Sequence, residues 1–501
     1  MLYMSPFSRC PSSGVNVALT SRHYVKLPTT ISELMSVITP SSLNDENEFS
    51  KRNIRIKFVN LLKNKHRKIT SSWRKNGTFM KMTSMTHKAS NMTSSMRDNI
   101  KKFKYQKTVS INVPKGAHFD KELGSGWFDK DGKPLATKSK FGRYVIPWET
   151  RATNKSFADF LIWRYQRYKL SKTSGHQLVP PESKSQFCLP TVEPDIPTPG
   201  LHNGYTGGGK ATWLGHSTVV FTVVTSSGEE GEKSGDIVNI ITDPHFTPRA
   251  SFLKYFGPKR YRSVFDDHPG LDSLGSKIDA VVISHDHFDH LDFGSLSILE
   301  SSNSKGGIMY YVPKGTKRYL TSKIDVPHEN VVELAWWESA KLSTVNSANP
   351  VTITCLPSQH WCSRTPFDVN LRLWCSWSIS SPLSKSYYYA GDTGLPDDFP
   401  LFETICDRVG PFDLSAIPIG AYKPRWFMRS QHVSPEEAVE LHCRLGSKRS
   451  LAIHYGTFAL ADEGWNEPVE DLDEACRLMG LDRKKDFLTL PHGGSVEVSS
   501  E

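Results

Sequence analysis

The sequence has few cysteines and no long apolar run, and both absences exclude classes of protein. Its 501 residues include eight cysteines, none in a CxxC pair, which is far below the density of a secreted scaffold held by disulfides. No stretch approaches the roughly 18 consecutive apolar residues that a membrane-spanning helix needs. Hydrophobic residues make up 38% of the chain and aromatic residues 11%, too many for a wholly disordered protein. The composition predicts a soluble or peripheral protein with reduced thiols.

Acidic residues are almost absent from one segment. Residues 51–107 hold 17 Lys and Arg residues and one acid, Asp98, whereas the net charge of the whole chain is +10. Residues 1–50 carry a net charge of −1 and residues 108–501 one of −5. The basicity therefore belongs to one tract. This weakens the inference of a nucleic-acid partner that the overall charge would otherwise favour.

Composition divides the chain into three parts. Residues 1–110 are rich in Ser, Thr, Asn, Met and Lys without sustained periodicity, which predicts a disordered basic N-terminal extension. Its first 31 residues lack acids and weakly resemble a mitochondrial presequence, while the absence of a continuous apolar segment argues against a secretory signal. Residues 111–205 are expected to lead into the catalytic domain at 206–501. Within this lead-in, Ser156–Leu170 predicts a helix that carries several aromatic side chains.

From Lys210 onward, short apolar runs alternate with loops. Strands with helices between and after them imply a layered α/β fold. A helix is expected after Ser434, because Ser caps a helix and Pro435 suits its first position. Eight runs have the β-branched and aromatic content and the Gly or Pro stops of strands: residues 213–224, 236–244, 277–286, 307–313, 352–360, 385–393, 414–420 and 449–456.

One short segment concentrates the side chains that bind metals. Residues 284–290 read SHDHFDH and follow a strand-like run. An apolar core would not accept these imidazoles and carboxylates without partners, because their desolvation is costly; a chance cluster in a solvated loop is the weaker alternative. His285 and His287, two residues apart, can reach one ion from an extended segment. Asp289 and His290 come after the turn and can reach a second ion.

Three further candidates stand at the ends of later strand-like runs: His360, Asp392 and His454. Taken alone, each of them could be an ordinary hydrogen-bonding or turn residue and not a metal ligand. Together with the SHDHFDH segment they predict a binuclear centre. Imidazole and carboxylate ligands suit Zn²⁺ better than Fe or Mn.

This order of ligands resembles the metallo-β-lactamase superfamily, from about Lys210 to the C-terminus. The resemblance implies an αβ/βα sandwich with two Zn²⁺ ions at one edge. It also implies that His216 supports the ligands, while His245 and His268 match no ligand position and are interpreted as ordinary loop residues. The implied ligands are His285, His287 and His360 on the first zinc, Asp289, His290 and His454 on the second, and Asp392 between them.

Longer stretches resemble the family of N-acylphosphatidylethanolamine-hydrolysing phospholipases D. They include residues 212–218 (TWLGHST), 241–244 (ITDP), 256–261 (FGPKRY), 420–428 (GAYKPRWFM) and 430–433 (SQHV). The resemblance reaches back to about Phe141. It implies a phospholipase D reaction that releases N-acylethanolamine and leaves phosphatidic acid.

The same resemblance implies roles for individual residues. Asp289 and His432 would be catalytic, with His432 donating to the leaving alkoxide, and Gln431 and His432 would contact the substrate. The alternative is that His432 has no catalytic role and is an ordinary histidine between a loop and the start of a helix. Phe288 stands where mammalian family members have Tyr, and Lys423 replaces an acidic residue. These two departures concern substrate contacts and leave the metal chemistry intact.

The resemblance further implies a peripheral homodimer that acts on a membrane phospholipid and binds no nucleic acid. Its expected place is the cytoplasmic face of intracellular membranes, with mitochondrial targeting as the alternative. The helix at 156–170 and the basic tract at 51–107 are candidates for contact with anionic lipid, although packing inside the protein is the default for the helix. Two other functions share the metal chemistry: a nuclease that binds RNA or DNA through the basic tract, and a lactonase or other carbon-ester hydrolase.

Overall fold

The structure is a computed structural model, and it describes residues 134–139, 141–148, 155, 157–172, 178–180, 190–199, 209–225, 236–251, 253, 255–303, 307–343, 349–382, 384–397 and 399–498. All of them belong to one compact unit that begins at Met92. The extension predicted at residues 1–110 lies outside the described residues, and so does the start of the lead-in.

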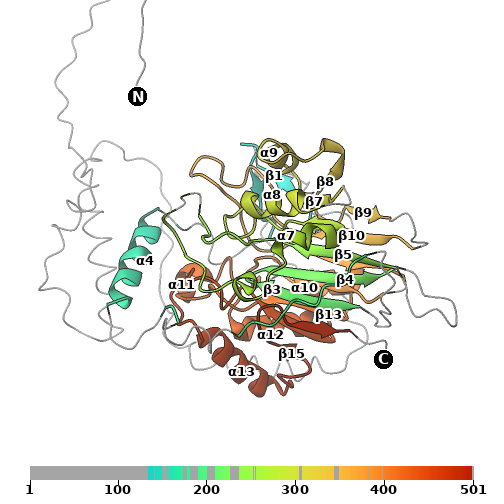
Figure 1. Ribbon diagram of the computed structural model, residues 1–501. Coiled ribbons are helices and arrows are strands. Elements are labelled where there is room, and N and C mark those ends of the chain that lie inside the picture. Colours follow the sequence, from blue (N-terminus) through green and yellow to red (C-terminus); the bar gives the residue numbers. More distant parts are fainter. Residues whose placement is uncertain are drawn as a thin grey trace, which may run out of the picture. The chain divides into compact units, whose positions relative to one another are not determined.

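Two seven-stranded sheets contain most of the strands (Figure 1). The first sheet consists of β3 (Lys210–Gly215), β4 (Thr218–Val224), β5 (Ile237–Thr242), β6 (Ala280–Val282), β7 (Met309–Pro313), β8 (Val331–Leu334) and β16 (Ser495–Glu497). The second consists of β9 (Ser339–Leu342), β10 (Val351–Leu356), β11 (Ser376–Ser380), β12 (Tyr387–Tyr389), β13 (Leu414–Pro418), β14 (Arg449–Ile453) and β15 (Phe487–Leu488). The spatial orders are β16-β3-β4-β5-β6-β7-β8 and β15-β14-β13-β12-β11-β10-β9. A small hairpin, β1 (Thr137–Lys138) with β2 (Tyr144–Val145), precedes them.

Strand β4 shows why the two sheets lie face to face. Its Val219, Phe221 and Val223 belong to the core cluster that also contains Ile353 of β10. Val220, between them in sequence, belongs to a second cluster with side chains of the helices. This alternation is the period-two pattern of a strand that is buried on both faces. One core thus lies between the sheets and another outside the first sheet.

Helices cover the outer faces of both sheets and complete the αβ/βα sandwich. The helix α7 (Leu271–Leu274), with α8 (Phe293–Ser301) and α9 (Lys317–Thr321), packs on the first sheet. The second sheet carries α10 (Leu401–Val409), α12 (Pro435–Arg444) and α13 (Glu467–Met479). Figure 1 shows α7, α8 and α9 beside the first sheet and α12 and α13 beside the second. The other α-helices among the described residues are α4 (Phe157–Leu170), α6 (Val264–Asp267) and α11 (Arg425–Met428).

The expected elements are present. Each of the eight apolar runs coincides with most or all of a strand. The first run contains the end of β3 and all of β4, which are separated by a turn at His216, whose φ is +50°. The predicted helix at 156–170 is α4. Helix α12 begins as predicted, because Ser434 accepts from the backbone N–H of Glu437 while the Glu437 carboxylate accepts from the N–H of Ser434. In the part of the chain that the structure describes, every helix is too short or too polar to cross a membrane.

Candidate metal centre

The predicted ligands follow strands whose carboxyl ends meet at one edge of the sandwich. Strand β11 is antiparallel to β10 and to β12, and β12, β13 and β14 are parallel. Strands β10, β12 and β14 therefore point the same way. His360, Asp392 and His454 follow these three strands, and the SHDHFDH segment follows β6 of the facing sheet. Sites in α/β folds commonly lie at such carboxyl ends.

The three histidines predicted for the first ion come together. His287 Nδ1 lies 2.9 Å from His285 Nε2 and 3.2 Å from His360 Nε2. Asp392 Oδ2 lies 3.9 Å from His285 Nε2 and 3.8 Å from His360 Nε2. Zinc bonds of about 2.0–2.1 Å in a tetrahedral site place ligand atoms about 3.3 Å apart. The spacing of these four atoms fits such a site.

The residues predicted for the second ion form an adjoining group. Asp289 Oδ2 lies 3.5 Å from both His290 Nε2 and His454 Nε2. Asp392 Oδ2 lies 3.1 Å from His290 Nε2, and its Oδ1 lies 3.1 Å from His454 Nε2. The carboxylate of Asp392 therefore reaches both groups, as a bridging ligand would.

Several buried atoms at this place have no hydrogen bond of normal geometry. Among the described residues they include His290 Nε2, His454 Nε2 and Asp392 Oδ1. An unsatisfied buried polar group costs about 1–3 kcal/mol. Atoms that converge without a hydrogen bond are the arrangement that a bound cation satisfies, so the residues present fit a metal centre.

Burial favours the neutral form in most of the imidazoles. It lowers the pKa of His360 and His432 to about 3 and that of His287 to about 4. At His454, burial also acts to lower the pKa, but the carboxylates of Asp392 and Asp289 outweigh it and raise the pKa to about 9. A neutral imidazole has the free lone pair that metal binding requires.

Hydrogen bonds behind the ligands fix their orientation. His290 Nδ1 donates to Asp243 Oδ2 (2.6 Å), which also accepts from the hydroxyl of Tyr389 (2.6 Å). His285 Nδ1 lies 2.9 Å from Ser284 Oγ, and this hydroxyl donates to Asp243. Such contacts set the tautomer of a ligating imidazole. The buried Asp243 was missed as a site residue, although the ITDP stretch at the end of β5 contains it.

His216, His245 and His268, which were not predicted as ligands, differ in position. His216 Nε2 lies 3.1 Å from Asp289 Oδ2, and its ring packs on His454 with centroids 4.2 Å apart. It therefore supports ligands, as expected. His245 lies in a loop, as expected, and is buried, with its Nδ1 3.1 Å from the guanidinium of Arg260. His268 is half-buried at the end of α6.

The predicted substrate residues follow α11 and face the first group. His432 Nδ1 lies 3.8 Å from Asp392 Oδ2 and has no hydrogen bond. The backbone carbonyl of Gln431 accepts from His360 Nδ1 (2.9 Å), and its side-chain oxygen accepts from the indole of Trp361. Gln431 thus orients a predicted ligand in addition to lying at the site.

The two residues that depart from the family pattern have other contacts. The ring of Phe288 lies 3.8 Å from the guanidinium carbon of Arg364. The ammonium of Lys423 pairs with Glu467 (2.5 Å) and Asp471 (3.6 Å) of α13. Lys423 therefore forms ion pairs with helix α13.

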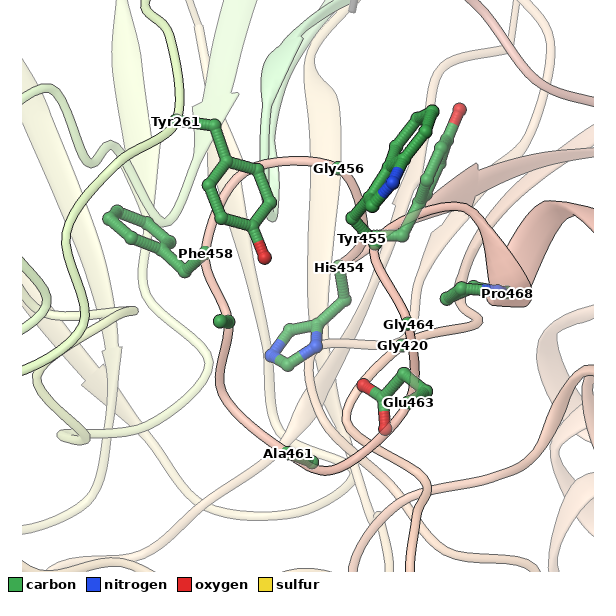
Figure 2. Close-up of a pocket in the computed structure, with 12 residues that line it drawn as sticks. Tyr261, Gly420, His454, Tyr455, Gly456, Phe458, Ala461, Glu463, Gly464 and Pro468 are labelled. Atoms are coloured by element: carbon green, nitrogen blue, oxygen red, sulfur yellow. The ribbon is translucent and has the colours of Figure 1, made fainter. Parts of the chain in front are cut away.

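A small cavity lies beside His454 (Figure 2). It measures about 20 Å³ and is lined in part by Tyr261, Glu463 and Trp465. Figure 2 shows the His454 ring projecting between Tyr261 and Glu463. Since about 10–15 Å³ is enough for one water, this is a place for ordered water and is much too small for a substrate.

The fold and the clustered ligands define a metal-dependent hydrolase of the metallo-β-lactamase fold. The family model of the β-lactamase superfamily domain matches residues 238–455. The N-acyl-phosphatidylethanolamine-hydrolyzing phospholipase D 1 of Caenorhabditis elegans is 39% identical over 295 residues, which cover 58% of this chain and 76% of the relative. The chain belongs to the N-acylphosphatidylethanolamine-hydrolysing phospholipase D family.

Two further relatives match over similar lengths of the chain. The mitochondrial N-acyl-phosphatidylethanolamine-hydrolyzing phospholipase D of Saccharomyces cerevisiae is 34% identical over 289 residues, covering 57% of this chain and 55% of the relative. An uncharacterized protein of Mycobacterium tuberculosis is 34% identical over 301 residues, covering 59% of this chain and 71% of its own length.

Proposed function

We propose that the protein is a binuclear zinc phospholipase D that hydrolyses N-acylphosphatidylethanolamine to N-acylethanolamine and phosphatidic acid. The observation that carries this proposal is the convergence of all seven predicted ligands into two adjoining groups, with Asp392 reaching both. The names of the relatives from Caenorhabditis elegans and Saccharomyces cerevisiae support the substrate.

Each group of ligands would hold one zinc ion. When bound, the ions lower the pKa of water from 15.7 towards about 7 and neutralise the phosphodiester oxygens. Asp289 is the carboxylate of the centre that is more open to solvent, with 15% of its side chain exposed against 2% for Asp392. One carboxylate oxygen of Asp289 lies 3.1 Å from Nε2 of His216. Asp289 is therefore placed to accept the proton of the attacking water.

His432 is the candidate donor to the leaving alkoxide. Its side chain lies at the edge of the centre, 12% exposed, and its ring lies 5.4 Å from that of His360 and 5.3 Å from that of His454. An N–H without a protein partner at this place can donate to an oxygen on which negative charge develops.

The phospholipid substrate requires access from a bilayer, and we propose a peripheral association. The segment 249–259 supports it, because Leu253, Tyr255 and Phe256 are exposed between Arg249 and Lys259. Apolar side chains with basic neighbours suit the surface of an anionic bilayer. The homodimer and the cytoplasmic face of intracellular membranes belong to the same proposal, and the mitochondrial yeast relative supports a mitochondrial membrane as the alternative.

A nuclease on the same fold is not favoured. The charge that would bind nucleic acid lies in residues 51–107, and residues 108–501 are net acidic. The relatives from Caenorhabditis elegans and Saccharomyces cerevisiae are named phospholipases.

The test is a comparison of substrates. The zinc-loaded protein is incubated separately with N-acylphosphatidylethanolamine, single-stranded RNA and a lactone, and the products are followed by mass spectrometry. We expect release of N-acylethanolamine, with loss of activity in Asp289→Asn and a lower kcat in His432→Ala. The exposed His328→Ala serves as the matched control. Cleavage of RNA alone would contradict the proposal.

A further inference from the structure

The loop that follows His360 packs against the SHDHFDH segment. Residues 361–372 leave the first group of ligands and return to the sheet at β11. The β1–β2 hairpin holds this loop from outside, because Arg143 donates to the carbonyls of Phe367 (2.9 Å) and Val369. The loop is thus a fixed part of the fold beside the metal centre.

One side chain of this loop binds the backbone of the metal-binding segment. Arg364 Nη1 donates to the carbonyls of Asp286 (3.1 Å), His287 (3.3 Å) and Leu291 (2.8 Å). These carbonyls surround the turn that carries Asp289 and His290. The guanidinium therefore holds the backbone of the turn both before and after Asp289 and His290.

Aromatic side chains of the same segment hold the guanidinium. Its carbon lies 3.8 Å from the ring centre of Phe288 and 5.2 Å from that of Phe293. A planar cation near an aromatic face gains a cation–π attraction that grows when water is excluded. Phe288, which lies between the predicted ligands His287 and Asp289, thus connects the metal-binding segment to Arg364.

A second arginine fixes the loop itself. Arg372 donates to Asp286, the residue between His285 and His287, and to Asp368. Asp368 in turn accepts from the backbone N–H of Arg364 (3.0 Å). The loop and the metal-binding segment are therefore tied by two guanidinium groups, the half-buried one of Arg364 and the buried one of Arg372.

We propose that Arg364 is a positioning residue of the metal centre. It holds the turn from Asp286 to Leu291 so that the flanking ligands present their atoms at metal-binding distances, and it acts through Phe288 and the three carbonyls. This inference rests on the proposed metal centre and is independent of the substrate. A lysine cannot replace Arg364, because an ammonium is a compact point charge without the planar fork.

The experiment measures metal binding directly. Zinc dissociation constants of the full chain are determined by competition with a chromogenic chelator, and the visible spectrum of the Co²⁺-loaded protein reports the ligand geometry. We expect Arg364→Lys to weaken zinc binding about 10–100-fold, the range for residues behind metal ligands, and to alter the Co²⁺ spectrum. Arg318→Lys, at an exposed arginine of α9, is the matched control and should change neither.

A second variant covers the case in which Arg364→Lys does not fold. Phe288→Leu keeps an apolar side chain and the three hydrogen bonds but removes the aromatic face. We expect about two- to fivefold weaker zinc binding, the equivalent of an exposed cation–π contact. Variants that melt at lower temperature but bind zinc and Co²⁺ as the wild type does would overturn the positioning role. Failure of the wild type itself to bind two ions would instead overturn the metal centre.

Discussion

At the scale of single residues, the centre depends on side chains that the ligand pattern does not contain. The spacing in SHDHFDH predicted four of the seven proposed ligands, because these four side chains lie within one short segment. Asp243 comes from a distant part of the sequence, and only the pairing of β5 with β6 brings it to His290. Its fully buried carboxylate accepts from an imidazole, two hydroxyls and a backbone N–H. A sequence pattern cannot show such a convergence.

Asp243 supplies a prediction at this scale. In Asp243→Asn the amide no longer provides a charged acceptor for His290 Nδ1, so the orientation and basicity of this ligand are lost. We expect zinc binding at the second group to weaken about 10–100-fold, measured by isothermal titration of the apoprotein. Asp272→Asn, at an exposed carboxylate of α7, is the control. Two unchanged zinc affinities in Asp243→Asn would contradict this role.

At the scale of elements, the sequence predicted most of the buried strands and missed β11 and the peripheral ones. Strand β11 is buried inside the second sheet, but its sequence alternates serine with Trp377 and Ile379 and so contains no continuous apolar run. The eight runs were visible because both faces of their strands are apolar. Strand β9 has only one buried residue, Leu342, and β15 has two residues in all, so neither has a sequence pattern long enough to recognise. Helix α4 was predicted, but the default interpretation that its aromatics pack inside holds for Trp163 and not for Phe160, which is 41% exposed.

Helix α4 supplies a prediction at this scale. Trp163 Nε1 donates to Asp462 Oδ2 (3.1 Å) and its ring stacks on Phe427 of α11 at 5.0 Å. Removal of this buried indole leaves a cavity and takes one hydrogen bond from Asp462, which keeps its ion pair with Arg167 (3.2 Å). We expect Trp163→Ala to lower the free energy of unfolding by about 3–5 kcal/mol, measured by urea denaturation followed by circular dichroism. Arg164→Ala, on the exposed face of the same helix, should change it by less than about 0.5 kcal/mol.

At the scale of the whole molecule, charge and function are separated along the chain. The net charge of +10 comes from residues 51–107, while the part that carries the centre is net acidic. An acidic domain has no general attraction to an anionic bilayer, so the membrane contact that we propose depends on local features. Beyond the basic tract, segment 249–259 is such a feature. Its base lies close to the centre, because Arg260 contacts the buried His245 and Tyr261 lines the cavity beside His454.

This segment therefore supplies the prediction for the whole molecule. Burial of an exposed side chain such as Phe256 in lipid contributes about 1.5–3 kcal/mol. The double variant Leu253→Ser with Phe256→Ser should bind vesicles of phosphatidylcholine and phosphatidylserine at least about tenfold more weakly in sedimentation assays. Because both side chains are exposed, hydrolysis of detergent-solubilised substrate should not change, whereas hydrolysis in vesicles should fall with binding. Leu478→Ser, at an exposed leucine of α13, should affect neither assay. Wild-type binding of the double variant would show that another surface carries the membrane contact.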